Sequence, residues 1–143
     1  MVTPNPFRRI ILFLGIAIIL SSCANLQAVY DEHAYQQAVS LKVEALDIMD
    51  KATTPFSNHK DQITDLKKEL AKAYEYAKGR PNNQEMTRQW EIMKNPERNL
   101  LAGFLHRWEQ EGSLSAGFVE EARELVAESF TKIIELESGK RKS

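Results

Sequence analysis

The chain has 143 residues, of which 43% are hydrophobic, with 19 Lys and Arg against 20 Asp and Glu. This composition is typical of one small globular domain, and the near-cancelling charges provide no basic excess of the kind that nucleic-acid binding needs. A single cysteine excludes an intrachain disulfide and a thiolate-rich metal site.

The first 20 residues have the pattern of a secretory signal. Arg8 and Arg9 precede a segment, residues 10–20, that is apolar apart from one Gly. As a helix this segment would reach about 16 Å, roughly half of the ~30 Å hydrocarbon core of a bilayer. It therefore has the length of a signal-peptide core and is too short for a comfortable membrane span.

The apolar segment ends in Leu20-Ser21-Ser22-Cys23, which resembles the lipobox of bacterial lipoproteins. The resemblance implies that residues 1–22 are removed and that Cys23 becomes an N-terminus carrying diacylglycerol and palmitate. By the same resemblance Ala24, where Asp would signal inner-membrane retention, indicates the periplasmic face of the outer membrane if the host has two membranes. Ser22-Cys23-Ala24 also fits an ordinary signal peptidase, whose cleavage would leave a secreted protein without a lipid.

Removal of the leader takes away Arg8 and Arg9 and no acidic residue, which leaves 17 basic and 20 acidic residues and a formal charge of −3. This balance predicts no nucleic-acid partner and no broad attraction to anionic lipid. We expect residues 23–143 to form a single domain held by its core alone, with no cofactor besides the lipid on Cys23.

The mature chain begins with two long helical patterns. Residues 24–54 contain no Gly or Pro and carry apolar side chains every three or four positions, which predicts one amphipathic helix that Pro55 ends. A second helix is expected over residues 58–78, with Ser57 or Asn58 as its cap and Gly79-Arg80-Pro81 as its stop.

Shorter helices follow. Asn82-Asn83 should begin one that runs through Met93, and Asn95-Pro96 has the order of an N-cap and a first-turn proline, which predicts a helix as far as Gly112. No strand alternation or Asn-Gly hairpin turn occurs, so the sequence predicts an all-α, up-and-down-like bundle of four to five helices.

The last helix should begin at Ser115 and end at Gly139, with Leu114 and Val119 placed for a hydrophobic staple. The basic tail beyond it is expected to be a solvated terminus, although contact with lipid headgroups or an anionic polymer is the alternative. The apolar stripe of this helix is expected to be Phe118, Ala122, Leu125, Ser129, Ile133 and Leu136, with Val119, Val126 and Phe130 beside it.

Motifs for catalysis or metal binding are absent from the sequence. No zincin, nucleophile-elbow, phosphate-loop or dinucleotide motif occurs. His33, His59 and His106 lie in separate segments with no metal-ligand spacing. Glu109 and Glu111 would point about 200° apart on a helix and cannot act on one atom. We therefore expect a protein that is not an enzyme.

The segment from residue 78 to residue 108 is the most distinctive, because it holds both tryptophans, several arginines and two proline turns. One interpretation is a groove between helices with aromatic walls and arginines that meet a carboxylate or an acidic partner. The other is that the aromatics are core and the arginines are solvated, which we favour for each residue taken alone. The possible binding surface comprises Arg80, Arg88, Trp90, Arg98, Phe104, Arg107 and Trp108.

Three functions remain open at this stage. The first is a lipid-anchored helical interaction or scaffold module that faces the periplasm and binds an envelope protein. The second is a carrier of a small ligand or metal with an interhelical pocket near Trp90 and Trp108. The third is an enzyme whose polar site is assembled from separate helices.

Overall fold

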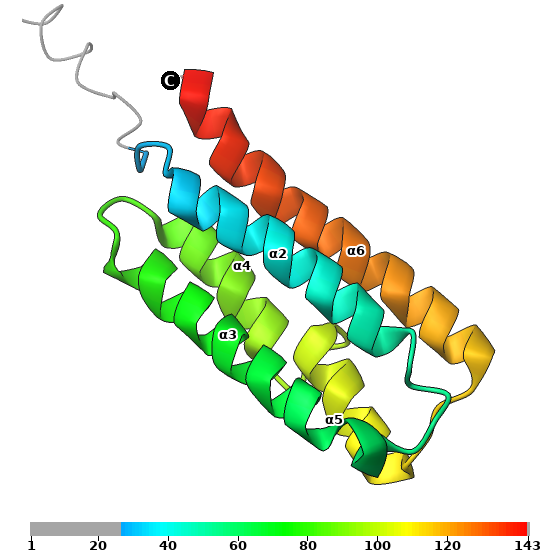
Figure 1. The fold of residues 1–143 in the computed structure, drawn as a ribbon. Coiled ribbons are helices and arrows are strands. Elements are labelled where there is room, and N and C mark those ends of the chain that lie inside the picture. Colours follow the sequence, from blue (N-terminus) through cyan, green and yellow to red (C-terminus); the bar gives the residue numbers. More distant parts are fainter. Residues whose placement is uncertain (1–26, 143) are drawn as a thin grey trace, which may run out of the picture.

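A computed structural model describes residues 27–142 (Figure 1). This part of the chain is helical and contains no strand, which confirms the all-α prediction. The predicted signal peptide, residues 1–22, and Cys23 lie outside the described residues. The elements are α2 (Glu32–Met49), η1 (Phe56–His59), α3 (Lys60–Gly79), α4 (Gln84–Lys94), α5 (Leu101–Glu111), α6 (Ala116–Gly139) and η2 (Lys140–Lys142).

The helices form an up-and-down bundle of four rods. α2 lies beside α3 and α6, and α4 closes the ring by packing on α3 and α6. α5 continues in the direction of α4, so these two short helices make up a third rod that is interrupted at residues 95–100 (Figure 1). Both ends of the described chain lie at one end of the bundle, where α2 begins and α6 ends.

The core follows the predicted stripes of the first two helices. Buried positions recur every three or four residues because one face of each rod points toward the bundle axis. In α2 the buried residues are Ala38, Leu41, Ala45, Ile48 and Met49, and in α3 they are Ile63, Leu66, Leu70, Ala73 and Ala77.

The starts of these two helices differ from the prediction, and α2 ends at Met49 instead of continuing to residue 54. α2 begins at Glu32, because Asp31 is its N-cap and accepts a hydrogen bond from Ala34 N at 2.8 Å. Residues 27–31 are not helical, and residues 24–26 of the expected helix lie outside the described part. α3 begins at Lys60 after a 3₁₀ turn, and neither expected cap precedes it directly. It ends at Gly79, the first residue of the predicted stop.

The third rod is broken at a point where the sequence predicted a helix. The side chain of Asn95 accepts a hydrogen bond from Glu97 N at 2.9 Å, but residues 96–100 form a turn and α5 starts only at Leu101. That turn lies so close to Gly103 that a Cβ there would be 1.8 Å from Arg98 O. The prediction of a helix from Pro96 was wrong. The capping residues are local to the turn, whereas the turn also packs against Gly103 in α5, and this contact cannot be seen from the capping residues alone.

α6 begins and ends as predicted but is rotated relative to the expected stripe. Ser115 caps it, with its Oγ accepting a hydrogen bond from Phe118 N at 3.4 Å. Leu125, a member of the expected stripe, is 47% exposed, and Phe118, another member, is only half-buried. The side of α6 that the bundle buries consists of Val119, Val126, Phe130, Ile133 and Glu137.

Candidate functional site

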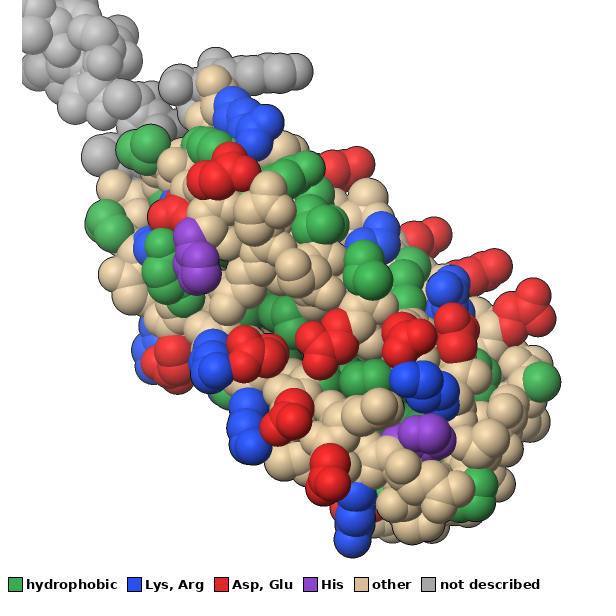
Figure 2. All heavy atoms as spheres, in the orientation of Figure 1, with side chains coloured by type: hydrophobic (Ala, Val, Ile, Leu, Met, Phe, Trp, Pro, Cys, Tyr) green, Lys and Arg blue, Asp and Glu red, His purple; other side chains and the backbone are tan. Residues whose placement is uncertain are grey.

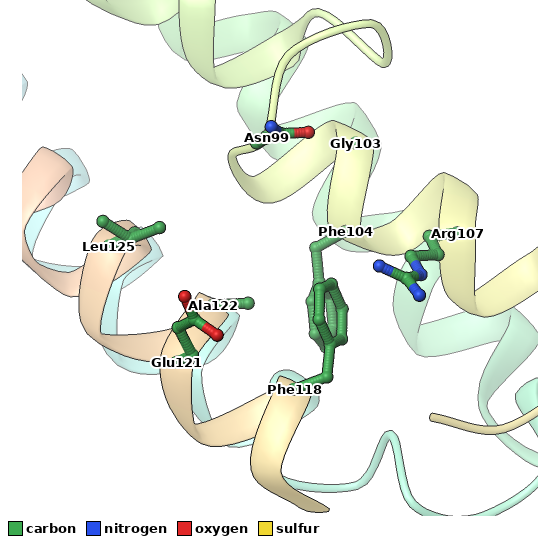
Figure 3. A pocket seen from close by; sticks show the side chains of 8 residues that line it. All are labelled: Asn99, Gly103, Phe104, Arg107, Phe118, Glu121, Ala122 and Leu125. Carbon is green, nitrogen blue, oxygen red and sulfur yellow. The ribbon is translucent and has the colours of Figure 1, made fainter. Parts of the chain in front are cut away.

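The rotation of α6 and the break before α5 together leave a hollow between these two helices. α5 makes little contact with α6, and a cavity of about 220 Å³ lies between them. Figure 3 shows side chains from both helices facing it. We call this hollow the α5–α6 groove. It is lined by Asn99, Gly103, Phe104, Arg107, Phe118, Glu121, Ala122 and Leu125.

A stacked aromatic pair forms one wall of the groove (Figure 3). The rings of Phe104 and Phe118 have centroids 6.0 Å apart and planes within 5° of parallel. Phe104 is buried and also packs on Trp108, while the Arg107 guanidinium lies 4.1 Å from the Phe118 ring centre. Because each ring is packed on a second side chain, this wall is pre-formed for an apolar group.

The two edges of the groove carry opposite charges. Glu121 lies on the α6 side, and Glu128 is exposed seven positions further along the same helix. Arg107 lies on the α5 side, and its Nε is 2.7 Å from Glu111 Oε1. Arg107 and Glu121 are the two charged residues of the lining. The arrangement is suited to holding an apolar side chain between charged edges.

The residues of the predicted binding surface do not lie together. Trp90 and Trp108 are buried in the core, where Trp90 packs on Phe130 and Trp108 Nε1 donates to Thr54 O at 3.0 Å. The prediction of tryptophan walls was therefore wrong, and the core interpretation holds for both residues. Neither tryptophan lines the hollows described here, including the pocket expected for a carrier.

The remaining members of that surface are distributed over three places. Phe104 and Arg107 meet in the α5–α6 groove. Arg88 lines a separate open hollow between α3 and α4, and Arg98 is exposed on the turn before α5. Arg80 also reaches the α3–α4 hollow, but its side chain is largely enclosed by a polar cluster at the end of the bundle.

That polar cluster, the Glu137 cluster, comprises Glu137, Arg80, Lys140, Asn83 and Asp31. Glu137 is fully buried, and its Oε2 lies 3.0 Å from Arg80 Nη1 and 2.7 Å from Lys140 Nζ. Its Oε1 accepts the Asp31 backbone N–H at 2.9 Å. Lys140 Nζ also donates to Asn83 Oδ1 at 2.7 Å. The buried carboxylate therefore has both ionic and hydrogen-bonding partners, as a buried charge requires.

The cluster fixes the segment that enters the first helix. Arg80 donates through Nη2 to Val29 O, and Ala28 N donates to Asn82 O at 3.0 Å. Asp31 accepts a hydrogen bond from Tyr76 OH at 2.8 Å. Residues 28–31 are thereby attached to the turn after α3 and to the last turn of α6.

Asp31 has a shifted acidity in this setting. Burial by itself would raise its pKa, but hydrogen bonds from Ala34 N and Tyr76 OH and the charge of Arg80 together hold the pKa of Asp31 below its usual value. The hydrogen bond to Asp31 raises the pKa of Tyr76. The fold therefore stabilises the ionised form of Asp31 relative to the protonated form.

The sequence interpretation missed this cluster and misplaced the basic tail. Lys140 is buried and so is not part of a solvated terminus, whereas Arg141 is exposed and stacks its guanidinium 4.1 Å from the Tyr30 ring centre. One signal was available: Glu137 continues the core stripe four residues after Ile133, with Lys140 three residues further on. A charge at an apolar position, beside an opposite charge at helical spacing, indicates a buried pair.

The three histidines are placed apart. His33 packs edge-on against Tyr76 with ring centres 4.8 Å apart, and His59 Nε2 is 2.8 Å from Thr54 Oγ1. His106 lines an open hollow between α3 and α5. Within residues 27–142, no group of three or more His, Cys, Asp or Glu is placed to hold a metal ion. No helix of this part of the chain is long and apolar enough to cross a membrane.

No family model, no curated protein and no solved structure matches the chain. Its function therefore has to be inferred from its own residues.

Proposed function

We propose that the protein is a lipid-anchored helical interaction module of the bacterial cell envelope that faces the periplasm and binds a partner protein in the α5–α6 groove. The observation that carries the proposal is the apolar stripe of α6 that the bundle does not cover. Leu125 is 47% exposed beside the half-buried Phe118, whereas Val126 and Phe130 of the same helix are fully buried. Exposed apolar side chains next to a pre-formed hollow are typical of a binding site.

The charges of the groove define the partner that it fits. A helix lying along α6 would place apolar side chains against Phe118 and Leu125, which is the helix-in-groove mode of recognition. Its basic residues would meet Glu121 and Glu128, and an acidic residue would meet Arg107 across the groove. The proposed partner is therefore an envelope protein that presents an amphipathic helix with basic residues along one edge.

The proposed lipid anchor is supported by the leader pattern that ends at Cys23. Ala28, the first described residue that is bonded to the bundle, is five positions after Cys23, a distance of at most about 18 Å. Leu125 lies 14 residues before the end of α6, or about 21 Å along the helix. The groove would thus stand clear of the membrane surface and remain accessible to a neighbouring protein.

A crosslinking experiment tests the docking. A photoreactive benzoyl-phenylalanine replaces Leu125 in the full chain, expressed in its native host and irradiated in intact cells. Val43 is the matched control, because it is apolar, exposed and on α2. We expect one protein to crosslink from position 125 and not from position 43. The same product from both positions, or none from position 125, would refute docking in the groove.

Two further measurements test the remaining parts of the proposal. Glu121→Lys combined with Glu128→Lys should weaken the crosslink from position 125, because basic residues of the partner would then face like charges. Mass spectrometry of the mature N-terminus should find a diacylglyceryl group on Cys23. An unmodified N-terminus downstream of Cys23 would remove the lipid anchor from the proposal.

A further inference from the structure

The end of the bundle that receives the N-terminal segment exposes an apolar residue. Val29 is 82% exposed, although its backbone is fixed: its carbonyl accepts a hydrogen bond from Arg80, and its neighbour Ala28 is bonded to Asn82. On the face drawn in Figure 2, hydrophobic side chains are visible near the end where the described chain begins, while charged side chains form a band across the middle. One exposed valine is not a binding patch by itself, so its neighbours decide what this end of the bundle can contact.

Tyr30, which follows Val29 in the chain, contacts Arg141, whose Nη2 also lies 3.4 Å from Glu32 Oε2. The guanidinium of Arg141 lies 4.1 Å from the ring centre of Tyr30 and 5.2 Å from that of Tyr35. The two rings have centroids 6.3 Å apart. Tyrosine rings and arginine are typical of the boundary between lipid and water, because their apolar parts and polar tips suit the two sides.

The length of chain before this end restricts what can cover it. Cys23 is six residues before Val29, so a lipid on Cys23 would hold the bilayer within about 22 Å of Val29 in any conformation of the intervening residues. The Glu137 cluster shortens the tether further, because it fixes residues 28–31 to the bundle. A surface tethered this close to the bilayer has a high effective concentration at the bilayer. Few residues are therefore enough to keep the surface in contact with lipid.

We propose that this end of the bundle, comprising Val29, Tyr30, Tyr35 and Arg141, is a membrane seat that rests on the phospholipid headgroups. This inference rests on the proposed lipidation of Cys23. Val29 enters the boundary between headgroups and acyl chains, the tyrosine rings lie at headgroup level, and Arg141 binds lipid phosphate. The body then stands on the membrane in a defined orientation and presents the α5–α6 groove at a fixed height.

Site-directed spin labelling tests the seat. Because the only cysteine is Cys23, an introduced cysteine is the one site for a nitroxide once Cys23 carries its lipid. The full lipidated chain with Val29→Cys is reconstituted into phosphatidylethanolamine–phosphatidylglycerol vesicles. Val43→Cys, also an exposed valine, and Ser113→Cys, at the opposite end of the bundle, are the controls. Power saturation compares accessibility to oxygen, which partitions into lipid, and to a water-soluble nickel chelate.

We expect the label at position 29 to be several-fold less accessible to nickel than the labels at positions 43 and 113, with oxygen accessibility raised. Arg141→Ala should restore part of the nickel accessibility at position 29. Equal nickel accessibility at positions 29 and 43 would overturn the seat. Mass spectrometry of the same samples separates the two proposals. An absent lipid contradicts the anchor, whereas a lipidated chain with an aqueous label at position 29 contradicts the seat alone.

Discussion

The Glu137 cluster and the α5–α6 groove, two parts of the same bundle, differ in which side chains they bury: the cluster buries a charge, and the groove leaves apolar side chains exposed. In the cluster, a fully buried carboxylate is ion-paired and hydrogen-bonded between α3 and the end of α6. In the groove, near the start of α6, apolar side chains are left exposed beside a stacked aromatic pair. The informative features are thus a buried carboxylate in the cluster and, in the groove, an apolar surface left exposed beside a hollow.

The comparison separates residues that hold the fold from residues that are available for binding. Removing one partner of a buried ion pair leaves the other charge without compensation, so stability depends on the intact cluster. Removing an exposed apolar side chain costs the fold little, because that side chain is already in contact with water. Substitutions in the cluster should therefore lower the free energy of unfolding, whereas substitutions in the groove should weaken binding.

The largest effect is expected from Glu137→Ala, which leaves the charges of Arg80 and Lys140 buried without their carboxylate. We expect the free energy of unfolding, measured by urea denaturation, to fall by about 3–5 kcal/mol. Glu135→Ala, an exposed glutamate on the same helix, is the control and should remain close to the wild type. A small effect of Glu137→Ala would mean that the cluster does not stabilise this end of the bundle.

A smaller effect is expected from Gly103→Ala, which tests the break that opens the groove. The new Cβ would lie 1.8 Å from Arg98 O, so the turn before α5 has to move. We expect a loss of about 1–3 kcal/mol in the free energy of unfolding. Gly117→Ala has no atom within 4 Å of its Cβ and should not destabilise α6. If both substitutions are tolerated equally, the close approach at Gly103 is not a constraint on the fold.

Asp31→Ala should cost about 1 kcal/mol at neutral pH, because it removes the N-cap of α2. The folded protein lowers the pKa of Asp31, so this carboxylate stabilises the fold above its unfolded pKa, near 4. The stabilisation is lost as the pH falls through the lowered folded value. The difference between wild type and Asp31→Ala should therefore shrink in acid, as measured by urea denaturation at several pH values.

Asp31→Asn provides the matched control, because an asparagine oxygen can still cap α2 but does not titrate. Its difference from Asp31→Ala should vary little over the same acidic range. A wild-type protein that loses no stability relative to Asp31→Asn in acid would contradict the lowered pKa.

The smallest effect on stability is expected from Leu125→Ala, with less than about 0.5 kcal/mol lost, because the side chain is half exposed. Binding should respond in the opposite way, since crosslinking from a photoreactive residue at position 122 should be strongly reduced. Val43→Ala should change neither stability nor crosslinking. If Leu125→Ala destabilised the protein as strongly as Glu137→Ala, the distinction between the two regions would not hold.

The helices could be predicted because their signals are local. Buried positions of α2 and α3 follow the three- and four-residue spacing, Ser115 caps α6, and Gly79 ends α3. Hydrogen bonds and side-chain neighbours in a helix lie within four residues, so the sequence shows them directly. The leader also has a local pattern, and its lipid on Cys23 stays a prediction because that residue lies outside the described part.

The candidate site could be predicted only in part. The sequence drew attention to the region that contains Phe104 and Arg107, which do line the groove. It placed Trp90 and Trp108 on a possible wall, but both are core, because bulky apolar rings are buried wherever neighbouring rods leave room. The facing wall, with Phe118 and Leu125, was recognised only as part of the apolar stripe of the last helix.

By itself the sequence determined a helical bundle and the approximate extent of its rods, whereas the lipoprotein leader stays a prediction. Tertiary structure decided which of two adjacent apolar stripes of α6 faces the axis, that Glu137 occupies the core, and that α5 departs from α6. Spacing fixes a face only to within the angle between neighbouring positions, 100° per residue. The final choice depends on which distant side chains fill the space, and for Glu137 on Arg80, which lies 57 residues away in the chain.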